Sequence, residues 1–138
     1  MVNKALYFKC LALPTGLGQE CNMSLEPSLA TRAVATDLID DVLRERRSFD
    51  SALARHNSIE VMSARDRAFV HTLAITTLRR LGTIDHLVDL CVERPLPRRA
   101  QQVRDILRIG CCQLLFMQVA DHSAVATSVE LTRQLGHS

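Results

Sequence analysis

The sequence lacks the features that mark membrane-spanning and disulfide-bonded proteins. No apolar run approaches about 18 residues, which predicts that no helix of the chain spans a membrane. The five cysteines are odd in number and include no C-x-x-C pair. Because no convincing signal peptide accompanies them, they are expected to be reduced and mostly buried thiols of a cytoplasmic protein.

Arrangements that carry catalysis or hold a cofactor are also missing. The five histidines never fall at metal-ligand spacing with a cysteine, so no metal site is predicted. There is no glycine-rich phosphate loop, and no Ser-His-Asp arrangement is suggested. Cys111 and Cys112 lie inside an apolar segment, where a thiol resists ionisation and serves as a small hydrophobe. We therefore expect no enzyme activity from the chain by itself and no cofactor.

The 138 residues, 47% apolar and 23% charged, fit one domain with a single core. Residues 1–27 differ from the rest, because no helical or strand period persists there and a proline stands beside two glycines. A signal peptide is the alternative, since Lys4 precedes an apolar run. Lys9 interrupts that run, however, and no small-residue cleavage site follows. We expect a poorly ordered, mobile tail, or an over-extended start with Met23 as the true initiator.

Residues 28–138 are expected to form an all-α domain, because apolar residues recur at helical spacing and no strand alternation persists. Capping residues predict where helices begin: Ser28, Ser63 in a capping box with Asp66, Thr83 and Asp121. A short helix is expected over residues 50–56, and a long helix from near Arg98.

Glycine and proline predict where helices end. Gly82 is expected to act as a C-cap behind Arg79 and Arg80. Pro95 and Pro97 end the next helix, whose apolar stripe is Ile84, Leu87, Val88 and Cys91, because a residue ahead of proline stays extended. These boundaries predict a compact bundle of five to six helices.

The long helix is expected to be central. It is apolar on nearly every side from Ile109 to Phe116, and such a helix belongs in the middle of a bundle. Gly110 weakens it by up to about 1 kcal/mol relative to alanine. We infer that Gly110 lets a neighbouring helix approach closely.

Arginine dominates the basic residues, accounting for fifteen of seventeen. Residues 65–108 hold nine arginines against five acids, whereas residues 28–60 hold five against six. Guanidinium groups bind phosphates and stack on unpaired bases, but surface arginines also simply solvate a helix or pair with nearby acids. The net charge of only +2 does not decide between these uses. Composition alone does not decide whether these arginines bind RNA or only solvate the surface of the helices.

Three segments carry a family resemblance: RDRAFVHTLAITTLRRLGTIDHLVDL (65–90), PLPRRAQQVRDILRIGCCQLLFM (95–117) and HSAVATSVELTR (122–133). In order, they resemble the third and fourth helices, the proline-marked loop with its leucine-rich helix, and the next helix of the NusB family. The resemblance is greatest to the form of that domain found at the N-terminus of small-subunit rRNA cytosine-C5 methyltransferases. The sequence departs from the family pattern at Thr76, Ala120 and Ala126–Thr127.

The resemblance implies a NusB-like bundle that binds RNA, and rRNA in particular, with neither DNA nor a membrane as a partner. The arginines expected to contact RNA are Arg32, Arg65, Arg67, Arg79, Arg80, Arg98 and Arg99, of which the last four are expected to form one phosphate-facing patch. The family's S-adenosylmethionine site and catalytic cysteines belong to a further domain that has no counterpart in this sequence.

Two alternatives remain open. A stand-alone NusB-type transcription antitermination factor, acting with a ribosomal protein, fits the chain length, but the RDRAF and QLLFM segments are methyltransferase-like. A truncated helical fragment could instead act only in protein association. The family continues with a further helix beyond Gly136, so we expect an exposed apolar strip that serves self-association or a methyltransferase domain. Its members would be Ile109, Leu114, Phe116, Val125 and Leu131.

Overall fold

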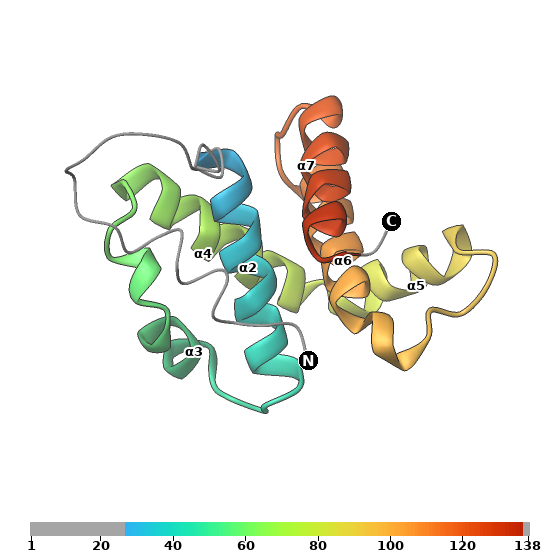
Figure 1. Cartoon of the computed structure of the whole chain (residues 1–138), viewed down its shortest axis with the longest axis horizontal. Coiled ribbons are helices and arrows are strands. Elements are labelled where there is room, and N and C mark those ends of the chain that lie inside the picture. The colour runs from blue at the N-terminus through green and yellow to red at the C-terminus, as the bar shows by residue number, and fades with distance from the viewer. Residues whose placement is uncertain (1–26, 137–138) are drawn as a thin grey trace.

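The computed structural model describes residues 27–136, and every regular element in that range is helical (Figure 1). The helices are α2 (Pro27–Leu43), α3 (Phe49–Arg55), α4 (Ala64–Arg79), α5 (Leu81–Cys91), α6 (Gln101–Phe116) and α7 (Asp121–Gln134). Short 3₁₀ turns occupy Asn57–Ile59 and Arg98–Ala100. The expected all-α class is confirmed. The expectations for the N-terminal tail, including Lys4, Lys9 and Met23, lie outside the described residues.

Helix α6 lies at the centre of the bundle, as predicted, although Leu114, Leu115 and Phe116 in its last turn are exposed. It contacts α2, α4, α5 and α7, and α2 also packs along α4 (Figure 1). Ile106, Ile109 and Cys112 of α6 are fully buried against the apolar faces of α2 and α4. None of the described helices is both long and apolar enough to cross a membrane.

The structure confirms the predicted start of α4. The hydroxyl of Ser63 accepts a hydrogen bond from the backbone N–H of Asp66 at 3.1 Å and donates one to the Asp66 carboxylate at 2.8 Å. The first of these bonds satisfies a backbone donor that has no partner within the helix.

The predicted boundary between α4 and α5 is wrong. Arg80 alone separates the two helices: its N–H donates to the Thr76 carbonyl at 3.0 Å, and its own carbonyl accepts from the N–H of Ile84 at 2.9 Å. Gly82 and Thr83 therefore lie inside the first turn of α5 rather than capping a break. Gly82 also lacks the positive φ that a glycine C-cap adopts.

Two smaller expectations also need correction. Ala120, not Asp121, is the N-cap of α7, and Asp121 lies in the first turn, where its carboxylate interacts favourably with the helix dipole. Cys91 is exposed although it falls in the apolar stripe of α5, because the last turn of that helix extends beyond the core.

The expected close approach at Gly110 is confirmed. A Cβ added to Gly110 would lie 2.9 Å from Oγ of Ser128 on α7. That hydroxyl is held in place by a 2.8 Å hydrogen bond to the carbonyl of Ala124. The bare glycine therefore lets α6 and α7 pack together.

Replacing Gly110 should be less favourable while Ser128 is present. Gly110→Ala should lose most of the gain in helix propensity, about 1 kcal/mol, because Ser128 must rotate away and give up its hydrogen bond to Ala124. In a Ser128→Ala background the same change should be neutral or stabilising, because the overlapping atom is gone. Urea denaturation of the unmodified chain, the two single variants and the double variant measures the interaction energy between Gly110 and Ser128. Additive effects of the two substitutions would contradict this account.

Candidate nucleic-acid interface

Some of the arginines are committed to internal ion pairs. The carboxylate of Asp105 on α6 is fully buried and accepts hydrogen bonds from Arg44 Nη2 and Arg108 Nη1, each at 2.8 Å. Arg44 lies just beyond the end of α2 and also pairs with Asp40. Asp105 therefore ties the end of α2 to α6.

The same network continues from α6 to α5. Arg108 Nε and Nη2 donate to the two carboxylate oxygens of Asp85 at 2.7 and 2.8 Å. Arg104 Nη2 lies 3.4 Å from Asp85 and 2.9 Å from Asp89. Burial raises the pKa of the Asp85 carboxyl, but hydrogen bonds and charge from Arg108 and Arg104 outweigh burial, so that pKa lies below its usual value. Three arginines thus pair with four aspartates, and these arginines cannot form a free basic surface.

Most of the arginines in residues 65–108 lie outside this network. Within residues 65–108, seven arginines remain against only two acids, Asp66 and Glu93. All seven are exposed, and none forms an ion pair with a carboxylate within the described part of the chain. They are Arg65, Arg67, Arg79, Arg80, Arg94, Arg98 and Arg99. Six of them were predicted from the sequence, and Arg94 was not.

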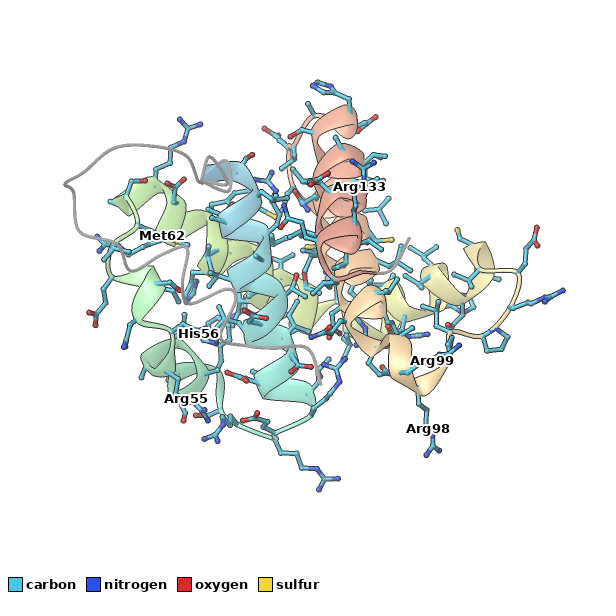
Figure 2. The ribbon with its side chains drawn as sticks, viewed as in Figure 1. Arg55, His56, Met62, Arg98, Arg99 and Arg133 are labelled. Carbon is cyan, nitrogen blue, oxygen red and sulfur yellow. The ribbon has the colours of Figure 1, made fainter. Side chains whose placement is uncertain are left out.

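The structure separates these arginines instead of gathering them into one patch. Arg98 points into solvent beside Arg99 at the start of α6 (Figure 2). Arg80 lies at the opposite end of that helix, where its Cζ is 5.3 Å from the ring centroid of Phe116. Because a 16-residue helix is about 24 Å long, Arg80 lies far from Arg98 and Arg99. Arg65 and Arg67 form a third group at the start of α4.

Arg32 occupies an internal position. Its Nε donates to Oε1 of Gln113 and its Nη1 to the carbonyl of Ser28, both at 2.9 Å, while its guanidinium covers the ring of Phe69 at 4.6 Å. The residue is only 7% exposed, and burial lowers the pKa of its guanidinium. Its RNA contact stays a prediction.

The expected apolar strip is partly present. Leu114, Phe116 and Val125 are exposed, as predicted, but Ile109 and Leu131 are buried. Ile109 faces the core formed with α2 and α4, which the all-round apolar pattern of α6 could not reveal.

The adjacent cysteines of α6 do not resemble a reactive pair. Cys112 is buried, and its thiol points to the carbonyl of Leu73 at 3.9 Å. Burial is the main cause that raises the pKa of both the Cys111 and the Cys112 thiols. No group of histidine, cysteine or acidic side chains suited to a metal ion occurs among residues 27–136.

Comparison with known proteins agrees with the helical architecture. A sequence model described as the NusB family matches residues 29–138. The chain is 31% identical over 104 residues to ribosomal RNA small subunit methyltransferase B of Shewanella oneidensis, covering 75% of this chain and 24% of that protein. It is 32% identical over 108 residues to the protein of the same name from Xanthomonas campestris, covering 78% and 24%. The chain therefore spans about a quarter of the length of these curated relatives.

Proposed function

Because the chain belongs to the NusB family, we propose that it is an RNA-binding helical domain similar to the accessory domain of an rRNA (cytosine-C5) methyltransferase. The observation that carries this proposal is the set of seven exposed arginines between residues 65 and 108, opposed by only two acids. The guanidinium group binds phosphate oxygens in a bidentate manner, and contacts to the phosphate backbone supply a large share of the affinity for nucleic acids. The relatives that act on ribosomal RNA favour rRNA as the ligand.

We further propose that the domain holds RNA without transferring a methyl group. Cys112 is buried and Cys111 half-buried, so neither thiol is presented as a nucleophile. The chain mixed with S-adenosylmethionine and small-subunit rRNA should transfer no methyl group, and measurable transfer would overturn this part of the proposal.

A NusB-type antitermination factor is the second candidate. It would use the same arginines on a leader RNA, together with a ribosomal protein. The likeness to two methyltransferases at 31% and 32% identity favours the first candidate. A domain that serves only protein association is the third, and it predicts no RNA affinity.

Salt dependence of binding tests the proposal. Fluorescence anisotropy should detect binding of the full chain to labelled fragments of small-subunit rRNA at low salt. The logarithm of the association constant should fall with the logarithm of salt concentration, by about 0.7 for each neutralised phosphate on single strands. Four contacted phosphates would give a slope of about −3. An arginine–phosphate interface would be contradicted if no rRNA fragment bound at low salt, or if the association constant did not change with salt concentration.

A further inference from the structure

Among residues 27–136, Phe116 is the phenylalanine that does not pack against the hydrophobic core. Phe49 and Phe69 both pack against the hydrophobic core, and each has a further ring contact: Phe49 with His71 and Phe69 with Arg32. Phe116, the last residue of α6, is 38% exposed and lies outside that core. An aromatic ring placed at the surface in this way needs another explanation.

An exposed cation lies over the ring. The guanidinium of Arg80 lies over it at 5.3 Å, a distance at which a cation and a ring attract each other. The backbone of Arg80 is fixed by hydrogen bonds on both sides, because this residue forms the whole junction of α4 and α5. Arg79 precedes it at the end of α4, and neither arginine has a carboxylate partner within residues 27–136.

We propose that Phe116 and Arg80 form a stacking surface for an unpaired RNA base, with Arg79 available for a neighbouring phosphate. This inference rests on the proposed RNA-binding function and makes it specific for single-stranded RNA. Aromatic rings and guanidinium planes stack on splayed-out bases, whereas bases within a duplex stack on one another and offer no free face.

The charge around Phe116 favours a nucleic acid over a protein as the ligand. Leu114 and Leu115 are also exposed at this end of α6, so an apolar protein surface is the competing occupant. Arg80 would then bring a positive charge to the rim, and no carboxylate among residues 27–136 forms an ion pair with it. Phosphates next to a stacked base supply that compensation directly.

The test compares a labelled 12-nucleotide single strand with a hairpin duplex of the same composition, using the full chain. Phe116→Leu keeps an apolar side chain but removes the ring, and it should weaken binding of the single strand on the order of tenfold while leaving the duplex unchanged. Arg80→Lys keeps the charge but removes the planar group, and it should produce a smaller loss of the same kind. Quenching of 2-aminopurine placed in the strand should diminish in both variants, which reports stacking directly.

Matched controls come from exposed residues of α7. Val129→Ala removes an exposed apolar side chain, and Arg133→Lys alters an exposed arginine that is paired with Glu130. Both should bind the single strand like the unmodified chain. The inference fails if Phe116→Leu binds both RNAs normally, or if it weakens both equally while circular dichroism shows an unchanged fold. If the unmodified chain binds no RNA at all, the proposed function fails first, so the two failures are distinguishable.

Discussion

Asp105→Asn should lower the free energy of unfolding by about 3–5 kcal/mol, the cost typical of breaking a buried ion pair by removing one partner. The carboxylate has no solvent exposure and receives hydrogen bonds from Arg44 and Arg108 at 2.8 Å. An asparagine side chain keeps the shape but loses the charge, and its amide hydrogens would face a guanidinium. Arg108 is only 11% exposed and would retain a single carboxylate, that of Asp85, as its partner.

Asp89→Asn is the matched control, because it makes the same chemical change at the exposed end of the same network. The Asp89 side chain is 63% exposed and, among residues 27–136, pairs only with Arg104, so this change should cost less than about 1 kcal/mol. Urea denaturation followed by circular dichroism at pH 7 measures both variants. Equal effects at the two positions would show that burial does not set the strength of this network.

Local signals made the helices predictable from the sequence. Ser63 and Asp66 lie three residues apart, and a capping interaction depends on that spacing alone. The junction at Arg80 shows the limit of such signals. Glycine often ends a helix and threonine often begins the next one. At Gly82 and Thr83, however, packing of α5 along α6 keeps the chain helical.

The division of the arginines into two classes depends on contacts between helices. The pairing of Arg108 with Asp105 is visible as an i, i+3 spacing, but Asp85 lies 23 residues away on another helix. Arg32 is occupied by Gln113, which is 81 residues away. Counting charges along the chain therefore predicted a basic segment but could not tell which of its arginines were already neutralised.

The two ends of α6 should contribute to RNA affinity separately. Reversing Arg98 and Arg99 to glutamate should weaken binding to an rRNA fragment by about tenfold to a hundredfold, the value expected when two charge-assisted hydrogen bonds to phosphate are lost. Helix content should not fall, because glutamates at the start of α6 interact favourably with the helix dipole.

Combining that variant with changes at the other end of α6 tests the separation. Arg79→Gln and Arg80→Gln remove two charges about 24 Å away, and sites this distant usually act additively within about 0.5 kcal/mol. The losses in binding free energy should therefore add when all four changes are combined. Arg133→Gln, which removes an exposed arginine paired with Glu130, should have little effect. If Arg133→Gln weakened binding as much as the change of Arg98 and Arg99, net charge alone would govern affinity and no defined interface would exist.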